Sequence, residues 1–175
     1  MPQLSLTAGE YGLEGEISLP AWENWQTEET DRIRLDFGGD RIDQGQELTE
    51  SYRKALAYLF ADQEAVKAAV LGGILHFFAQ QEQALLSDAV EEDFGLDCLP
   101  HIREIEDLMG EIWLEEVHIL PVERDGLCYI GYAFRCRWDE EGLGVMTCGR
   151  RVVETGGRDT SLLCWLAEDD LEHPH

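Results

Sequence analysis

Three consecutive carboxylates, Asp139, Glu140 and Glu141, are the residues of this sequence whose types and spacing come closest to catalytic or metal chemistry. Acidic side chains at a strand turn can bind a divalent cation, or act as a general acid and a general base. Adjacent residues of a strand point to opposite faces, so the three carboxylates converge only if the turn is unusual. A metal-dependent hydrolase that uses Asp139, Glu140 and a nearby histidine stays an alternative, and we predict no catalytic residue, metal or cofactor.

The histidines and cysteines do not have the spacing of ligands or nucleophiles. None of the five histidines pairs as HxH or HxxxH within an expected helix or strand, and no two cysteines form a CxxC pair. A zinc site needs three or four such ligands that converge. The five widely spaced cysteines are typical of reduced thiols in a cytosolic protein. The sequence also lacks GxSxG, GxGxxG and GxxxxGKS/T, so it predicts neither a serine nucleophile nor a phosphate loop.

The charge of the chain limits its function most strongly. The sequence has 37 acidic and 13 basic residues, so its formal net charge is -24. Such a surface repels nucleic acid and anionic lipid, and attracts basic proteins or cations. Hydrophobic residues make up 44% of the chain, which is enough for a folded core. The apolar stretch 65–78 contains Lys67, His76 and two glycines, and the first residues do not resemble a signal peptide. We therefore expect a cytoplasmic protein with a basic protein partner, and no nucleic-acid or membrane partner.

Strands are expected in residues 1–40. Ile33, Leu35 and Phe37 alternate with polar residues, which is the two-residue period of a half-buried strand. Trp22 and Trp25 lie between this strand and an earlier one. The two indoles can either close the edge of the core or form a contact surface for a partner.

Helices are expected in residues 48–110. Thr49 suits the N-cap of a first helix, and Asp62 suits the cap of a second one, in which apolar residues repeat at helical spacing from 63 to about 86. Gly72 and Gly73 interrupt the repeat, which indicates close packing against a neighbour or a kink, and His76 is expected in the core or at its boundary. An acidic loop follows at residues 87–97. Its carboxylates are Asp88, Glu91, Glu92, Asp93 and Asp97.

A β-meander is expected in residues 111–160. One strand covers 112–120 and stops at Pro121, and a second runs through the alternating residues 128–138. Residues 139–142 form a turn, after which strands at 143–148 and 151–155 complete a three-stranded antiparallel meander. Residues 165–175 are an acidic, frayed tail. The predicted fold class is α+β, with one domain (1–175) whose antiparallel sheet packs against two to three helices.

Two segments of the meander resemble a known family. The sequences WDEEGLGV at 138–145 and RVVETGG at 151–157 are similar to a bacterial family catalogued as domain of unknown function 6985. In that family histidine is usual at the position of Glu141, and this departure weakens a metal or catalytic role for the turn. The resemblance implies no enzymatic activity, and it implies that some members act as immunity partners of toxins.

Charge and resemblance together favour an intracellular acidic binding protein, namely an immunity protein that neutralises a cognate toxin by steric and electrostatic occlusion. A carboxylate-rich surface steers onto a basic face, and aromatic anchors then supply most of the affinity. We predict that Trp22, Trp25 and the carboxylates of the acidic loop from Asp88 to Asp97 form the partner-binding surface. The alternatives are the hydrolase and a regulatory or structural domain with no toxin partner.

Overall fold

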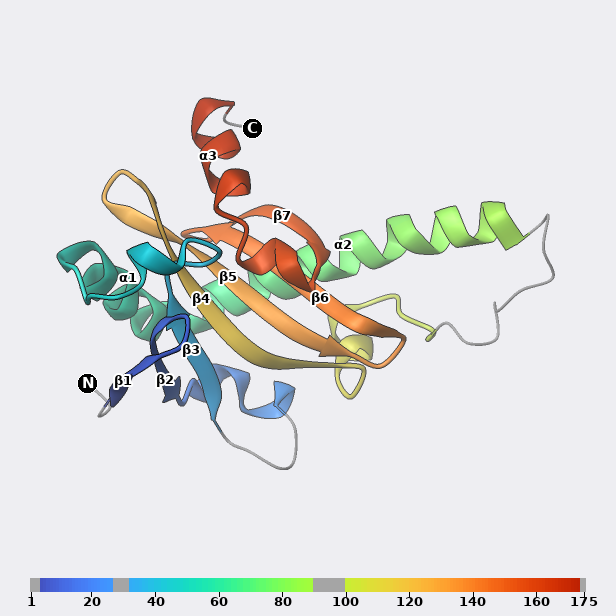
Figure 1. Cartoon of the computed structure of the whole chain (residues 1–175). Helices are drawn as coiled ribbons and strands as arrows, with labels where there is room; N and C mark the ends of the chain where they lie inside the picture. Colours follow the sequence, from blue (N-terminus) through green and yellow to red (C-terminus); the bar gives the residue numbers. More distant parts are fainter. Residues whose placement is uncertain (1–3, 27–31, 90–99, 174–175) are drawn as a thin grey trace.

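The computed structural model describes residues 4–26, 32–89 and 100–173, apart from the side chains of residues 84–89. Its centre is one seven-stranded sheet whose strands follow the chain order from β1 to β7 (Figure 1). Neighbouring strands are antiparallel, except that β3 and β4 pair in parallel. The predicted α+β class and the antiparallel C-terminal meander are therefore confirmed.

The strands form two groups along the chain. The first group is β1 (Leu6–Gly9), β2 (Gly12–Ile17) and β3 (Ile33–Phe37). The second group is β4 (Ile112–Arg124), β5 (Leu127–Cys136), β6 (Asp139–Cys148) and β7 (Arg151–Gly157). The parallel β3–β4 pair joins the two groups. These two strands can run in parallel because the helical segment between them forms a crossover connection.

Helices lie on both faces of the sheet (Figure 1). One face carries α1 (Glu50–Ala61) and α2 (Gln63–Ala89), and the other carries α3 (Cys164–Glu172) and the 3-10 helix η5 (Arg158–Ser161). The remaining 3-10 helices are η1 (Pro20–Trp25), η2 (Ile42–Gln44) and η4 (Ile105–Leu108). The predicted cap of α1 is confirmed, because the Thr49 hydroxyl accepts a hydrogen bond of 3.2 Å from the Tyr52 backbone N–H.

Both predicted contact tryptophans belong to the main core, which lies between the sheet and α1, α2 and η1. Trp22 is 1% exposed, and its ring stacks on Tyr132 with the centroids 5.9 Å apart. Trp25 is 5% exposed. A buried indole removes a large apolar area from water and has little surface left for a partner. The core alternative is therefore correct for Trp22 and Trp25, and their prediction as a contact surface is wrong.

Two glycines allow helical segments to approach the sheet closely. A Cβ atom added to Gly131 of β5 would lie 1.6 Å from the carbonyl oxygen of Ser161, so only glycine lets η5 lie on the strand at this point. On the opposite face, a Cβ atom added to Gly73 of α2 would lie 3.2 Å from Val152 of β7. The close packing predicted at this glycine pair is thus confirmed for Gly73, whereas Gly72 has open space beside it.

Two strand boundaries differ from the prediction. β4 continues past Pro121, because its pairing with β5 shifts register between Ile119 and Glu123 and the proline lies within this irregularity. The segment predicted as a turn at 139–142 is instead the start of β6, in which Asp139 pairs with Cys136. Long-range pairing therefore extends both strands beyond the limits that the local turn residues predict.

The acidic tail and His76 also differ from the prediction. Residues from Cys164 to Glu172 form α3 rather than a frayed end, because Ala167 and Asp170 are buried against the sheet. His76 is exposed on α2, although it was expected in the core or at its boundary. The helix turns this position away from the stripe that contains Ile74 and Phe78.

Candidate functional site

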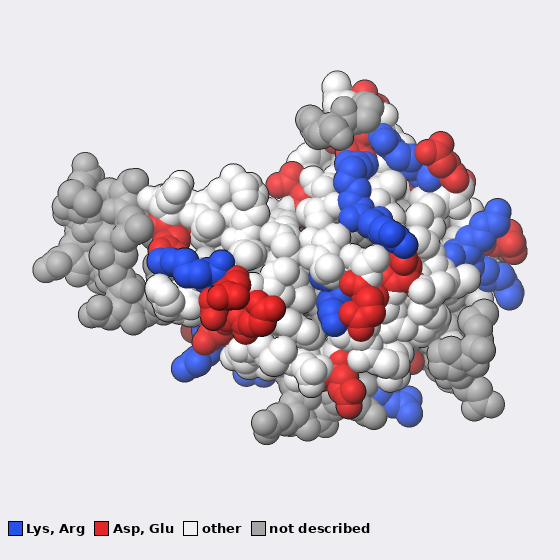
Figure 2. Space-filling view, turned by 180° about the vertical axis from the view of Figure 1, so that it is seen from behind, with Lys and Arg blue, Asp and Glu red and all other residues white. Residues whose placement is uncertain are grey.

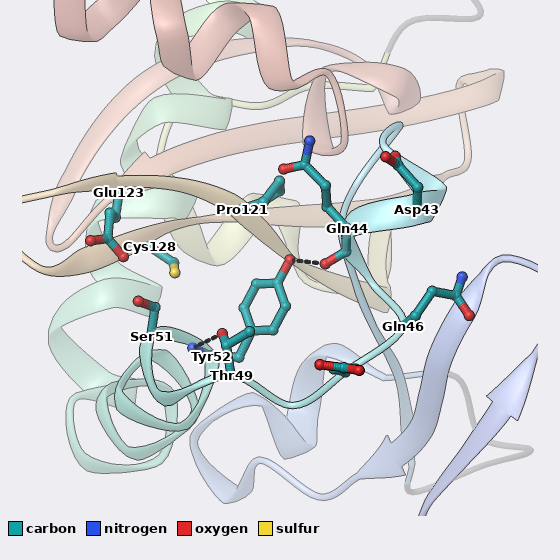
Figure 3. A pocket seen from close by; sticks show the side chains of 10 residues that line it. Asp43, Gln44, Gln46, Thr49, Ser51, Tyr52, Pro121, Glu123 and Cys128 are labelled. Atoms are coloured by element: carbon teal, nitrogen blue, oxygen red, sulfur yellow. Dashed lines mark hydrogen bonds between the residues drawn. The ribbon is translucent and has the colours of Figure 1, made fainter.

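The site best suited to bind another molecule is a pocket lined by carboxylates. Its volume is about 490 Å³, and it lies between the η2 segment, the first turn of α1 and the hairpin that joins β4 to β5 (Figure 3). The lining residues are Asp43, Gln44, Gln46, Glu47, Thr49, Ser51, Tyr52, Pro121, Glu123 and Cys128. We call this set of residues the acidic pocket.

Tyr52 holds one wall of the acidic pocket in place. Its hydroxyl donates a hydrogen bond of 2.7 Å to the backbone carbonyl of Gln44, as Figure 3 shows, and its ring tilts against Phe37 with the centroids 5.0 Å apart. Gly45 has no room for a side chain, because a Cβ atom there would lie 2.1 Å from the Phe37 carbonyl oxygen. These contacts fix the η2 segment beside α1, so the pocket is formed before any partner binds.

The acidic pocket contains exposed negative charge without a matching positive charge. Asp43, Glu47 and Glu123 are exposed, and the lining contains no Lys or Arg. Within the described ranges, none of these three carboxylates forms an ion pair. By contrast, Asp62 of the α1–α2 junction is bonded by the guanidinium of Arg150 at 2.6 and 2.8 Å. The pocket can therefore attract a cation such as a lysine ammonium or an arginine guanidinium.

The thiol in the pocket wall is not activated. Cys128 is 1% exposed, and Figure 3 shows its sulfur near Ser51 and Tyr52. Burial, with a smaller contribution from the charge of Glu123, raises the pKa of the Cys128 thiol to about 12. The thiol is therefore protonated at neutral pH, and it is not a nucleophile. The arrangement suits binding of a cation rather than covalent chemistry at Cys128.

On the α2 side of the molecule, acidic and basic groups are mixed. Figure 2 shows this face, on which the visible Lys and Arg atoms lie next to Asp and Glu atoms, with uncharged residues between these groups. Lys67 pairs with Glu64 at 3.0 Å, and Arg103 pairs with Glu82 at 3.1 Å. A surface of mixed sign produces a weaker field than carboxylates alone. The acidic pocket is therefore the better candidate for binding a basic partner.

A second charged cluster lies on the α3 side of the sheet, across β2, β3, β4 and η5. It consists of Glu14, Arg34, Asp36, Glu116, His118 and Arg158, and we call it the His118 network. Strand pairing places Asp36 opposite both Glu14 and His118, and it places Arg34 opposite Glu116. The Arg34 guanidinium consequently reaches three neighbouring carboxylates at distances of 3.2, 3.4 and 3.8 Å.

His118 is the buried centre of this network. Its side chain is 5% exposed, and its Nδ1 and Nε2 atoms lie 2.5 Å and 3.2 Å from the carboxylates of Asp36 and Glu116. Burial by itself lowers the pKa of His118, but hydrogen bonds to the two carboxylates outweigh burial and raise the pKa to about 9. The hydrogen bond from His118 is in turn the main reason why the pKa of Glu116 falls to about 2.

Both nitrogens of His118 are therefore protonated and hydrogen-bonded at neutral pH. An imidazolium in this state neither accepts a proton nor offers a lone pair to a metal ion. Arg158 of η5 adds a further contact, 3.4 Å from Glu116. The His118 network thus joins three strands to η5, and its carboxylates are already neutralised.

The predicted acidic loop falls largely outside the described residues. Glu91, Glu92, Asp93 and Asp97 are not described, and for Asp88 only the backbone is described, in the last turn of α2. The partner-binding role of these five carboxylates stays a prediction.

The carboxylates at the start of β6 do not converge. The Asp139 carboxylate accepts a hydrogen bond of 3.0 Å from the Glu141 backbone N–H, while the side chains of Glu140 and Glu141 are exposed. Nowhere in the described part of the chain do three or more His, Cys, Asp or Glu side chains come together in a way that could hold a metal ion. Nothing in this arrangement favours the hydrolase alternative.

Sequence reasoning did not find the acidic pocket. Asp43 and Glu47 lie in a polar segment just ahead of the Thr49 cap, and this position indicates an exposed loop at the start of a helix. That pattern could have drawn attention to the two carboxylates. Glu123 joins them only through the β4–β5 hairpin, so no local pattern in the sequence connects it to the pocket.

Most of the chain matches one known family. Residues 13–163 match the model of that family, which covers the acidic pocket and the His118 network and ends just before α3. Neither curated proteins nor solved structures give a match. Among the described residues, no helix has both the length and the apolar character needed to cross a membrane. The chain belongs to the family described as Domain of unknown function (DUF6985).

Proposed function

We propose that this protein binds a basic partner protein, and that its acidic pocket receives lysine or arginine side chains of that partner. The observation that carries the proposal is the group of three carboxylates, Asp43, Glu47 and Glu123, which form no ion pair within the described residues and whose pocket is lined by no Lys or Arg. A volume of about 490 Å³ lies within the range of pockets that hold small ligands, so one or two extended side chains fit.

The overall charge supports the same proposal. A net charge of -24 attracts a basic protein before contact, and the pocket then offers a fixed place for its cationic groups. Attraction of this kind raises the association rate and makes it sensitive to salt. It weakens strongly between 0.1 M and 1 M salt, because the Debye length falls from about 10 Å to about 3 Å.

We further propose that the binding serves immunity. The sequence resemblance to toxin-immunity partners supports this form of the function, as does the surplus of carboxylates. A cytoplasmic immunity protein of this charge would cover the basic face of a toxin, such as the nucleic-acid cleft of a nuclease, and so exclude its substrate.

Co-expression with the product of the neighbouring gene tests the immunity proposal. We expect rescue of growth and a stoichiometric complex that dissociates as salt is raised. Unchanged growth without a complex would reject the immunity function.

Two matched variants test the pocket. The pocket variant carries Asp43→Asn, Glu47→Gln and Glu123→Gln, and the control variant carries Glu10→Gln, Glu23→Gln and Glu154→Gln, which are exposed acids elsewhere. Both variants change the net charge equally. We expect the pocket variant to lose rescue and the control variant to keep it, and equal rescue by both would reject the pocket as the binding site.

A further inference from the structure

Among the described residues, two of the five exposed large apolar side chains lie on α3, and a third lies beside a residue that is ion-paired to α3. The large apolar side chains that are exposed in the described residues are Tyr11, Ile42, Met109, Trp165 and Leu171. Trp165 and Leu171 belong to α3, and Trp165 is the most exposed of the set at 57%. Ile42 belongs to η2, and Arg41, the residue before it, forms an ion pair with Glu168 of α3. An indole exposed in this way offers a partner a large apolar area with a fixed shape.

α3 is held firmly on the sheet. The Asp170 side chain, which is 1% exposed, accepts hydrogen bonds of 2.6 and 2.9 Å from Arg151 and one of 2.7 Å from the Tyr129 hydroxyl. At the other end of the helix, the Cys164 backbone N–H donates to the Asp40 carboxylate at 3.1 Å. Both ends of α3 are therefore fixed, and a rigid element presents its outer side chains in one defined arrangement.

The outer face of α3 combines this indole with carboxylates. Trp165, Asp169 and Glu172 are spaced at i, i+4 and i+7, so they lie along one side of the helix. All three side chains are exposed. Asp169 lies 3.4 Å from His173, and Glu172 forms no ion pair within the part of the chain that the structure describes. Neither carboxylate is paired with a Lys or Arg there, so negative charge remains beside the ring.

An arginine side chain fits this combination. The guanidinium stacks on an indole through cation–π attraction, and its planar N–H donors bind carboxylates in pairs. A lysine ammonium is attracted by the same charges, but it lacks the planar surface that stacks on the ring. Tryptophan and arginine are also among the residues that most often carry the affinity of protein interfaces.

We propose that the outer face of α3 is a docking surface for an arginine-bearing segment of the partner protein, with Trp165 stacked on the guanidinium and Asp169 and Glu172 facing its charge. This inference rests on the proposed function, because it takes the partner to be basic, and it adds the place and the residue type of one contact. The family match ends at residue 163, so it does not extend over α3.

An octa-arginine peptide is the probe, and octa-lysine is the comparison of equal charge. We expect octa-arginine, titrated into the full chain at low salt, to shift the NMR cross-peak of the Trp165 indole N–H. The variant Trp165→Phe identifies this cross-peak, because the peak is absent from its spectrum. Trp165→Ala should weaken octa-arginine binding about 3- to 10-fold, with a smaller effect on octa-lysine. Tyr11→Ala is the matched control, because Tyr11 is 54% exposed in the turn between β1 and β2, and it should leave both affinities unchanged.

The possible failures are distinguishable. If octa-arginine binds the wild-type chain and the pocket variant weakens it, while Trp165→Ala and the Trp165 cross-peak show no change, the α3 surface is wrong and the proposed function survives. If neither peptide binds the full chain at low salt, recognition of a basic partner is itself wrong. Equal losses of octa-arginine affinity in Trp165→Ala and Tyr11→Ala would also overturn the α3 surface, because any exposed aromatic ring would then bind the peptide equally well.

Discussion

The His118 network and the acidic pocket use carboxylates in opposite ways. In the network, the side chains of Asp36 and Glu116 are only 16% and 22% exposed, and each lies within 4 Å of a basic group. In the pocket, Asp43 and Glu123 are exposed and have no such neighbour in the described residues. A buried carboxylate needs a partner because its desolvation is unfavourable, whereas an exposed one does not. Paired charges therefore contribute to folding here, and unpaired charges remain available for recognition.

The largest expected effect comes from His118→Gln, which removes the positive charge at the centre of the network. The carboxylates of Asp36 and Glu116 then face each other with less compensation in a largely buried place. We expect the free energy of unfolding to fall by about 3 kcal/mol, as measured by urea denaturation at pH 7. The control is His76→Gln, an exposed histidine on α2, for which we expect less than about 0.5 kcal/mol. Equal losses in the two variants would show that the network does not stabilise the fold.

The pH dependence of stability should reveal the same group. The pKa of His118 is raised from 6.5 to about 9 on folding, so its stabilising contribution is complete below pH 6.5 and is lost as the pH rises through 9. This corresponds to a loss of about 2 kcal/mol between pH 7 and pH 9. Denaturation of the wild type and His118→Gln across this range measures the loss. The stability difference between the two proteins should shrink with rising pH, and a constant difference would contradict the raised pKa.

Low pH should also weaken the His118 network, through Glu116. The pKa of Glu116 is lowered from 4.5 to about 2, so its contribution is present above pH 4.5 and is lost as the pH falls towards 2. At pH 7 Glu116→Gln should therefore be less stable than the wild type. Near pH 2 the two proteins should have nearly the same free energy of unfolding, as measured by the same denaturation experiment.

A smaller effect is expected where α3 meets the sheet. Asp170→Asn keeps the size of the side chain and its contact with Tyr129, but it removes the charge that Arg151 and Arg124 approach. Both arginines can turn towards solvent, so we expect a loss of about 1.5 kcal/mol in the free energy of unfolding. Hydrogen exchange should show the loss concentrated in α3. Uniform loosening of the whole sheet would contradict the view that Asp170 acts as a local anchor.

Local patterns in the sequence predicted the elements but not the sites. The alternation from Cys128 onwards and the Thr49 cap each depend on neighbouring residues, and both predictions were confirmed. The contact between Asp36 and His118 depends on the parallel register of β3 and β4, with the helical segment between them. No pattern in either strand specifies that register, because each strand offers several alignments that bury its apolar face.

The difference between local and long-range contacts also explains two wrong predictions, the strand end at Pro121 and the frayed tail at residues 165–175. Pro121 is a local stop signal, but β4 continues past it and carries Glu123 into the pocket wall. An acidic tail is a local sign of fraying, but Asp170 finds Arg151 on the sheet and a helix forms. In both places a contact with a distant strand outweighs the local preference, and these are the places where the candidate binding surfaces arise.

The smallest expected effect on stability comes from the acidic pocket. The contrast with the large effect expected in the His118 network is the sharpest test of the difference between the two sites. The pocket variant removes three exposed carboxylates that have no ionic partner in the described residues, so the free energy of unfolding should change by less than about 0.5 kcal/mol. The sign should be towards greater stability, because the net charge moves from -24 towards zero and self-repulsion falls. Yet the same variant should bind octa-arginine more weakly than the control variant of equal charge, with a shallower dependence on salt. A destabilised pocket variant would mean that these carboxylates serve the fold after all, and equal binding by both variants would mean that the peptide responds only to total charge.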